Sequence, residues 1–485
     1  MLRLTQRPLI PPVWLGAAIG AGLLAALPLE IAFLALAGVT LGALSLIDLR
    51  IPVAMTLILA PLKALIETEA AWYLPADIGQ IVFAGTVSLW LLKQIASGRR
   101  IIVPRLSMLG PVMAFIFAAS LSLLTAESVG VTLNELIKWL QTAVMALIAA
   151  SLCQRCGVGW LLCALLAAAG VQALIGLYQF MGGSGAPHLW ILDYRYFRAF
   201  GSFGQPNPFG AFMGMTLPLA LGALFGALST AWQSRKWRGV WLWVALGLSA
   251  AAALIGGGLV ASWSRGAWLG FAAALVTLIL LAPRRLWHGI AITVICASLV
   301  SAAMLSSMIP NTLLARFSDF AQDLTGFQDA RGVPINDANY ATVERLAHWQ
   351  AALSMADESP FFGVGFGGYQ IAYERHALVN WPLALGHAHN FYLNVLAETG
   401  AVGLMAYIGM WIGLGLLGVR ALRLQNAFQR GVSLGVLAVW AHIAIHSLFD
   451  KLFVNNLFLH FGAMLGLIGT LVAAVEQCHS KSKAT

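Results

Sequence analysis

Long apolar runs recur along almost the whole chain, from Val13 to Ala474, and they constrain its fold more than any other feature. A helix needs about 20 predominantly apolar residues to cross the hydrocarbon core of a bilayer. Within lipid every backbone polar group must be paired internally, so spanning segments are helices or closed barrels. The runs therefore predict an all-α polytopic membrane protein with about 12–14 transmembrane helices and one large, partly helical exterior loop. The predicted spans lie near residues 13–28, 29–47, 52–66, 78–95, 106–125, 133–152, 157–180, 206–230, 238–260, 266–282, 288–308, 389–418, 431–449 and 454–475.

The composition excludes a soluble protein, because 60% of the residues are hydrophobic and only 10% are charged. Soluble domains carry about 25% charged and about 45–50% apolar residues. A net charge of +9 could suggest nucleic acid, but no basic groove with interleaved aromatic residues is present. The first run follows Arg3 and Arg7 as a signal peptide would, yet it continues without a convincing cleavage site. We expect that run to remain as a helix.

The placement of cations predicts the orientation in the cytoplasmic membrane. If the N-terminus lies inside, every even-numbered crossing returns to a basic loop, which satisfies the positive-inside rule. Both termini are then expected in the cytoplasm. The inside positions are Arg50, Lys93, Arg99, Arg100, Arg105, Arg155, Arg235, Lys236, Arg238, Arg284, Arg285, Arg420, Arg423, Arg430, Lys481 and Lys483.

A few arginines fall on the predicted outer side, against this bias. Ion pairing with nearby carboxylates accounts for several of those in the long loop, residues 309–388. Arg198 and Arg265 have no acidic residue within helical reach, and Arg265 lies in an abrupt polar break, residues 262–266. A cation at such a depth faces protein or water and is a functional candidate.

The long loop is too polar to span and longer than the roughly 15 residues of a passive connector. Apolar side chains in 341–355 have helical spacing, and a glycine-rich segment follows at Gly363–Tyr369. A lone GxGxxG is weak support for a phosphate site, so we expect a tight backbone approach that folds the loop onto the helices. The loop would then act as a lid.

The long loop ends in two histidines, His387 and His389, next to Asn390. Three interpretations of the histidines are open: a metal site, a helix cap, or a general base, since histidine titrates near neutral pH. No carboxylate stands at ligand spacing in the flanking segment, so we predict no metal. Asn390 would orient an acceptor or cap the helix. Cys153 and Cys156 have redox spacing but lack a partner pair, so a structural role is expected.

Four segments together resemble the O-antigen ligase and O-antigen polymerase family. Arg198–Asn207 (RAFGSFGQPN) is similar to the signature before its central helix, and Ser264-Arg265-Gly266-Ala267 resembles its second motif. The third motif is matched by His389-Asn390 followed by Gly400 and Gly403. The loop residues Glu344, Arg345, Trp349, Pro360 and Gly363–Gly368 also fit, and the resemblance covers roughly residues 190–450.

The resemblance implies a metal-independent, inverting glycosyltransferase of the bacterial inner membrane, without a cofactor. Its donor would be a glycan on undecaprenyl diphosphate, and its acceptor a lipid A core, another glycan or a protein hydroxyl. Arg198 and Arg265 would hold the diphosphate, since paired guanidiniums grip phosphates bidentately. His389 would deprotonate or orient the acceptor hydroxyl. Further substrate-binding candidates are Arg195, one helical turn from Arg198 and able to substitute for it, with Asn207, Ser264, Arg345, Tyr369, His387 and Asn390.

The predicted organisation has four parts: N-terminal spans in 1–180, central spans with the arginine motifs in 181–308, the loop in 309–388, and C-terminal spans with a short tail in 389–485. Apart from substrates, membrane lipids are the expected partners, and nucleic acid is not. A transporter or flippase is the alternative, and it predicts internal repeats with charges near mid-membrane. A non-catalytic scaffold is a third possibility. Transport would be favoured if three charged residues proved essential, namely Glu135, Lys138 and Glu398.

Overall fold

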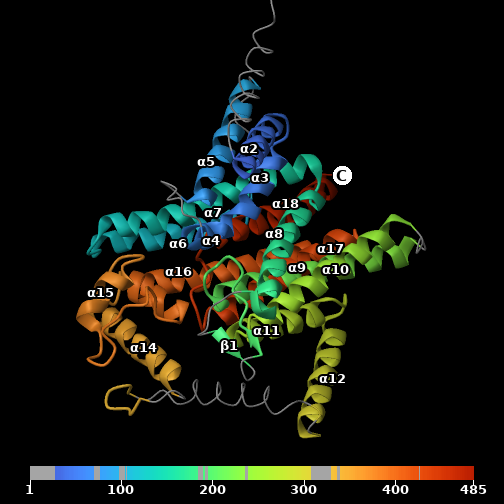
Figure 1. The fold of residues 1–485 in the computed structure, drawn as a ribbon. Coiled ribbons are helices and arrows are strands. Elements are labelled where there is room, and N and C mark those ends of the chain that lie inside the picture. The colour runs from blue at the N-terminus through green and yellow to red at the C-terminus, as the bar shows by residue number, and fades with distance from the viewer. Residues whose placement is uncertain are drawn as a thin grey trace, which may run out of the picture.

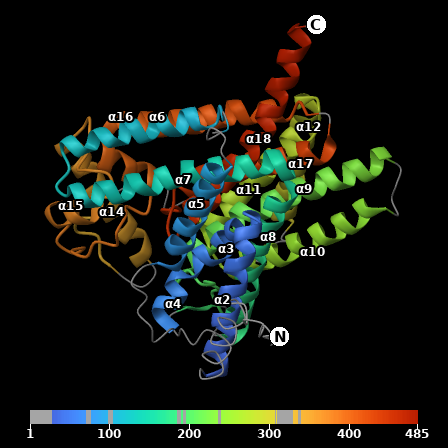
Figure 2. The same cartoon turned by 90° about the horizontal axis from the view of Figure 1, so that it is seen from above.

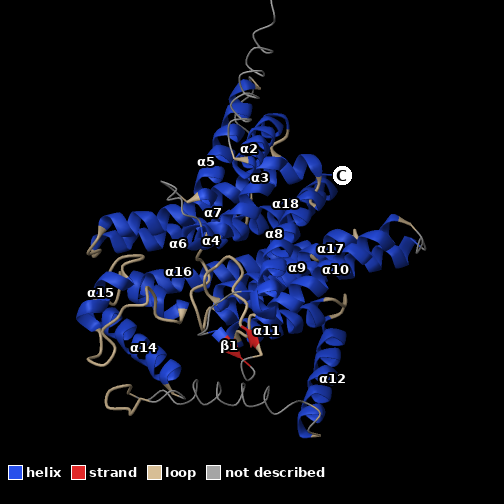
Figure 3. Ribbon diagram, in the orientation of Figure 1, coloured by secondary structure: helices blue, strands red, loops and turns tan. Residues whose placement is uncertain are grey.

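The computed structural model describes residues 28–69, 77–97, 104, 106–183, 189–191, 195–234, 239–306, 308, 329–335, 339–424 and 426–484. Within these residues the protein is a bundle of helices with one small β-hairpin, β1 (Trp190–Ile191) and β2 (Tyr196–Phe197), shown in red in Figure 3. The helices, labelled in Figure 1, are α2 (Leu29–Ile47), α3 (Arg50–Leu59), α4 (Lys63–Glu69), α5 (Ile78–Ala96), α6 (Leu109–Ser120), α7 (Val129–Cys156), α8 (Gly159–Tyr178), α9 (Pro206–Ser234), α10 (Val240–Ala261), α11 (Arg265–Leu281), α12 (Leu286–Leu305), α14 (Tyr340–Glu358), α15 (Tyr369–His376), α16 (Phe391–Ala421), α17 (Ala427–His446) and α18 (Leu457–Ala484).

The described helices confirm an all-α polytopic membrane protein. Nine of them are long and apolar enough to cross a bilayer, and three shorter apolar helices lie at Ala35–Ile47, Leu109–Leu124 and Arg265–Leu281. The predicted span 52–66 is a broken helix, in which α3 gives way to a 3-10 turn, Ala60–Leu62, before α4. The predicted span 13–28 lies, except for Pro28, outside the described residues.

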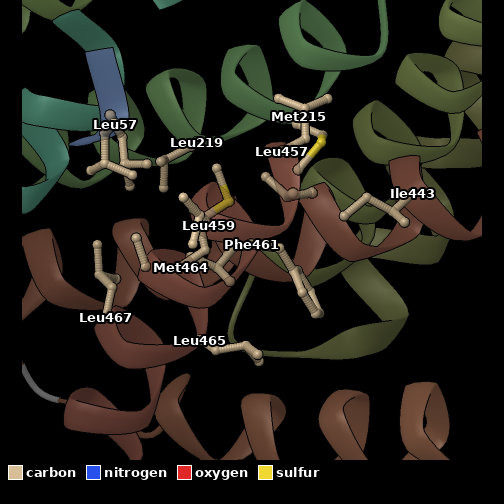
Figure 4. Packing of buried hydrophobic residues seen from close by; sticks show 14 of the residues in the cluster. Leu57, Met215, Leu219, Ile443, Leu457, Leu459, Phe461, Met464, Leu465 and Leu467 are labelled. Atoms are coloured by element: carbon tan, nitrogen blue, oxygen red, sulfur yellow. The ribbon is translucent and has the colours of Figure 1, made fainter. Parts of the chain in front are cut away.

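Glycines let the central helices approach closely. A Cβ on Gly222 of α9 would lie 2.5 Å from the Cα of Gly435 on α17, and one on Gly462 of α18 would lie 2.5 Å from the carbonyl oxygen of Thr142 on α7. Small residues at such crossings allow backbone contact where lipid gives no hydrophobic driving force. The resulting interior is filled by residues such as Leu457, Phe461 and Met464 (Figure 4).

The helix α12 stands apart from this centre. It packs against α11, and only Gly289 among its residues is buried. Figure 1 shows it projecting beside the bundle, in yellow. A helix that is apolar all round and exposed in this way suits contact with lipid.

Most of the described part of the long loop lies in residues 339–388, which contain α14 and α15 and are held on the bundle by the glycine segment. The N–H groups of Val364 and Gly365 donate to the carbonyls of Ala397 and Glu398 at 3.0 Å each. A Cβ on Gly363 would collide with the backbone of Glu398, and φ there is +70°. The expected tight backbone approach is therefore present, and α14 confirms the amphipathic helix predicted at 341–355.

The long helix α16 is broken at Gly400, where φ is +64°. Past the break, the N–H of Ala401 donates to the carbonyl of Pro360 at 2.8 Å instead of to its own helix. Figure 2 shows the rest of α16 running beside α6, with which it packs. The break thus turns the first part of α16, which follows His389, toward the long loop.

Candidate active site

Arg198 is positioned by a turn that glutamines of the neighbouring helix hold in place. The side-chain oxygen of Gln179 accepts the N–H groups of Phe200 and Gly201 at 3.0 and 2.7 Å, and Gln172 accepts the N–H of Ser202 at 3.0 Å. The Arg198 side chain donates from Nε to the carbonyl of Ser262 at 3.3 Å. The first motif is therefore tied to the second through Arg198.

The second motif forms the start of α11. Ser264 is the N-cap, and its Oγ accepts the N–H of Ala267 at 3.4 Å. This capping places Arg265 in the first turn, where the helix dipole also favours an anion. Three guanidiniums converge nearby: burial, and then the charges of Arg265 and Arg345, lower the pKa of Arg198 to about 10.

These arginines surround one cavity of about 140 Å³, which we call the arginine cavity. It has room for the charged head of a ligand or for several waters, and not for a whole glycan or lipid chain. Arg198 and Arg265 meet here as predicted, and Arg345 joins them from α14 of the long loop. The lining residues are Arg198, Asn207, Trp263, Ser264, Arg265, Gly266, Ala341, Arg345, His446 and Phe449.

Asn207, in the first turn of α9, connects the arginine cavity with a second group of residues. Its side-chain oxygen accepts the Ser264 Oγ–H at 3.0 Å and the Arg198 Nη2–H at 3.4 Å. The side chain of Asn207 also lies near the carboxylate of Asp450, which it stabilises and which lies between α17 and α18. Because the side-chain oxygen accepts from Ser264 and Arg198, the amide N–H₂ is the group available to Asp450.

The second group consists of His387, His389 and Asp450. The backbone N–H of His389 donates to His387 Nδ1 at 3.0 Å, so the proton of a neutral His387 lies on Nε2. That Nε2 faces Asp450 Oδ1 at 3.5 Å. The N–H of Phe391 donates to the carbonyl of Ser447 at 2.7 Å, which joins the start of α16 to the end of α17 and brings the three residues together.

His389 has the most unusual setting of the predicted residues. Its φ is +52°, which is uncommon for a residue with a side chain. Both ring nitrogens are buried, and neither has a hydrogen-bond partner within the described part of the chain. Burial lowers its pKa below the ordinary value, so the ring is neutral at neutral pH. A buried polar group without a partner is costly, and a bound ligand would relieve that cost.

The site is supported from the long loop by His348 and Tyr369. The Tyr369 hydroxyl lies 2.9 Å from His348 Nδ1, and the His348 ring packs edge-on against His389 with centroids 5.7 Å apart. Burial lowers the pKa of His348 to about 4. Tyr369 is fully buried and does not line the arginine cavity, so it acts through its neighbours rather than by direct contact with that cavity.

Two predicted residues take other places. Arg195 lies in the exposed turn of the β-hairpin, and because Tyr196–Phe197 is a strand, the expected helical spacing to Arg198 is wrong. Asn390 is the N-cap of α16 and accepts the N–H groups of Tyr392 and Leu393 at 3.0 and 3.2 Å. Of its two predicted roles, the structure therefore shows the cap, and neither histidine serves as the cap.

A metal ion could find ligands in this group. One ligand atom from each of His387, His389 and Asp450 can be chosen so that all lie within 4.8 Å of one another. Two histidines and a carboxylate are chemically suitable for a divalent cation with an open position. Addition of a chelator distinguishes such a metal site from the metal-independent site that the sequence predicts.

Sequence reasoning missed three residues of the site. Asp450 and His446 lie about 60 positions after the histidine motif, and only the pairing of α16 with α17 brings them to it. Trp263 lines the arginine cavity in a left-handed conformation, with φ of +51°. A carboxylate just after a predicted span was the one signal for Asp450 in the sequence.

The comparisons with known proteins bear on the same region. Residues 250–408 match the family model described as O-Antigen ligase. No curated protein matches the chain. The matched residues include Arg265, the long loop and His389, whereas Arg198, Asn207 and Asp450 lie outside them. The described helices thus make the chain a multi-pass membrane protein, and its residues 250–408 are similar to the O-Antigen ligase family.

Proposed function

We propose that this protein transfers a glycan from undecaprenyl diphosphate to an acceptor hydroxyl on a lipid A core or another glycan, at the outer face of the inner membrane. The acceptor oxygen attacks the anomeric carbon, the bond to the diphosphate breaks, and the configuration inverts. The lipid diphosphate leaves, and the hydroxyl proton passes to His389 or to water. Both termini are cytoplasmic in this proposal.

The arginine cavity is the observation that carries the proposal. Three guanidiniums held together around a small, partly open cavity repel one another, and an anion between them would offset that repulsion. A diphosphate supplies two adjacent anionic groups, and its charge grows as the glycosidic bond breaks. Fixed donors aimed at developing charge are among the largest contributions to catalysis. Arg198, Arg265 and Arg345 would provide this stabilisation.

The histidine group supports an acceptor site beside the cavity. His389 is neutral and has acceptor capacity to receive a hydrogen bond from a sugar hydroxyl. Glycosyl transfer passes through an oxocarbenium-like state, in which the nucleophile needs little deprotonation before attack. Orientation of the hydroxyl would therefore come first, and proton acceptance late. The Asp450 carboxylate would then stabilise the imidazolium, as the aspartate does in a catalytic triad.

The test is transfer in vitro from an undecaprenyl-diphosphate glycan, with purified wild type compared with His389→Ala. We expect wild type to transfer the glycan, with or without EDTA, and His389→Ala to be reduced by about 100-fold or more. An equally active His389→Ala variant would refute the role of the histidine. A large loss with EDTA, restored by added zinc, would instead assign the histidine group to a metal.

A further inference from the structure

A cluster of four charged side chains lies next to the histidine group but outside the arginine cavity. It comprises Glu135 and Lys138 of α7, Glu398 of α16, and Lys451, which directly follows Asp450. Glu135 is 5% exposed, and Glu398 is fully buried. The Lys451 ammonium lies 3.6 Å from Glu135 Oε1, and Lys138 lies 2.6 Å from Oε2 of the same carboxylate. Glu398 also attracts Lys451 electrostatically.

Stability alone is a poor explanation for such a cluster. Removing charges from water costs several kcal/mol per ion, and the mutual attraction of a buried pair often does no more than offset that cost. Packed apolar residues of similar size are commonly as stabilising. A role in fixing one arrangement of the surrounding residues is better supported, because two parts of the site contact this cluster.

The first of these elements is the segment that carries Asp450. The backbone N–H of Lys451 donates to Asp450 Oδ1 at 2.8 Å, and that same oxygen faces His387 Nε2. Fixing the Lys451 side chain therefore fixes the carboxylate beside the histidines.

The second element is the long loop. Glu398 Oε1 accepts the N–H of Tyr369 at 3.4 Å, and the Tyr369 hydroxyl bonds His348, whose ring lies against His389. The carbonyl of Glu398 holds Gly365 of the glycine segment. Glu398 thus joins the loop and Lys451 in one buried contact network.

We propose that Lys451, held between Glu135 and Glu398, is a positioning residue that fixes Asp450 and the two histidines for transfer. This inference rests on the proposed function and adds a role for charges that the arginine cavity and the histidine group do not use. Lys451 acts through Asp450 and does not touch the substrate in this scheme.

The experiment compares Lys451→Met with Lys451→Arg in the transfer assay, per amount of folded protein. We expect Lys451→Met to lower kcat on the order of 10- to 100-fold, the effect of a small misplacement near the reacting groups, with the donor KM unchanged. Lys451→Arg should restore most of kcat. Arg420→Met, which removes an exposed pair with Glu476, is the matched control and should match wild type.

A triple variant, Glu135→Gln/Glu398→Gln/Lys451→Met, guards against misfolding because it leaves no unbalanced charge among these three. It should melt like wild type and still show the loss of kcat. The inference would be overturned if Lys451→Met kept the wild-type kcat, or if Lys451→Arg failed to restore it. It would also be overturned if the loss of activity in the triple variant were no larger than the loss of folded protein. In these cases the proposed function still stands if the wild-type protein transfers the glycan and His389→Ala does not. If the wild-type protein transfers no glycan, both the proposed function and the role of Lys451 are refuted.

Discussion

The chemistry of the site depends on which atom of each polar side chain is already engaged. His387 Nδ1 accepts the backbone N–H of His389, so the ring proton lies on Nε2, which faces Asp450. Asn207 uses its oxygen toward Ser264 and Arg198 and its amide toward Asp450. Both residues therefore have a fixed orientation before any substrate binds, and fixed polar groups need no reorganisation during the reaction.

Asn207 allows a sharp test of this connection. Asn207→Asp loses the donor and places a second carboxylate beside Asp450, while Asn207→Leu loses both hydrogen-bonding functions. We expect each variant to transfer at roughly one tenth of the wild-type rate or less, since a bond to a charged group contributes about 1.5–3 kcal/mol. Initial rates at saturating donor measure the effect.

Asn426→Asp is the control for Asn207→Asp, because Asn426 caps α17, a role that aspartate fills equally well. It should be fully active. If Asn207→Asp were as active as this control, the proposed bridge between the arginine cavity and the histidine group would be wrong.

Single site residues could be predicted where their charge is unusual for their position in the predicted topology. Arg198 and Arg265 stood out as cations on the wrong side of the charge bias, and they do line one cavity. Asp450 was missed because a carboxylate near a helix end is ordinary in sequence and becomes unusual only when burial is known. Arg195 was misjudged because helical spacing was assumed across what is a strand.

Among the elements, α16 shows how one glycine shapes the site. At Gly400 φ is positive, and an added Cβ would collide with the backbone of Phe361. The helix therefore breaks there, and its open turn binds the backbone of Pro360 and Phe361, which precede the glycine segment. His389 stands in front of the first part of α16 and Glu398 near its end, so the break affects both.

Gly400→Ala should lower the melting temperature in detergent by several degrees and reduce transfer. The left-handed conformation and the collision together cost roughly 2 kcal/mol or more. Differential scanning fluorimetry measures the change.

Gly409→Ala in the same helix is the matched control, since an added Cβ there meets nothing within 4 Å. It should melt at the wild-type temperature or slightly above, because alanine favours a helix over glycine. Equal melting temperatures for the two variants would argue against strain at Gly400.

Most helices could be predicted from apolar length alone, and their ends agree within a few residues. The break in α16 could not, because a glycine inside an apolar run is common in membrane helices and does not by itself indicate a kink. The short β-hairpin was also not predicted, since two-residue strands carry no alternation pattern.

For the molecule as a whole, charge placement predicts an orientation that labelling can test. In a variant with all five cysteines replaced, Arg331→Cys in the long loop should react with an impermeant maleimide in intact spheroplasts. Arg284→Cys, between α11 and α12, should react only after permeabilisation. Both positions are exposed, so burial does not confound the comparison. The reverse pattern would invert the orientation and place the arginine cavity inside the cell.

The fold class followed from composition, but the assembly of the site did not. The positive-inside rule predicts that the three separated motifs lie on the outer side of the membrane. Whether they meet depends on the packing of α9 against α17 through glycines and on the contact of the loop with Glu398. Such pairings between distant segments leave no periodic signal in a single sequence.

The backbone of His389 has a consequence for attempts to engineer this protein. A left-handed residue with a side chain costs on the order of 1 kcal/mol or more, and glycine would remove that cost. A library selected only for heat resistance should therefore enrich His389→Gly, although that change would remove the side chain on which the proposed transfer depends. Screens for robust variants of this protein would then lose the proposed activity at this position unless turnover is selected at the same time.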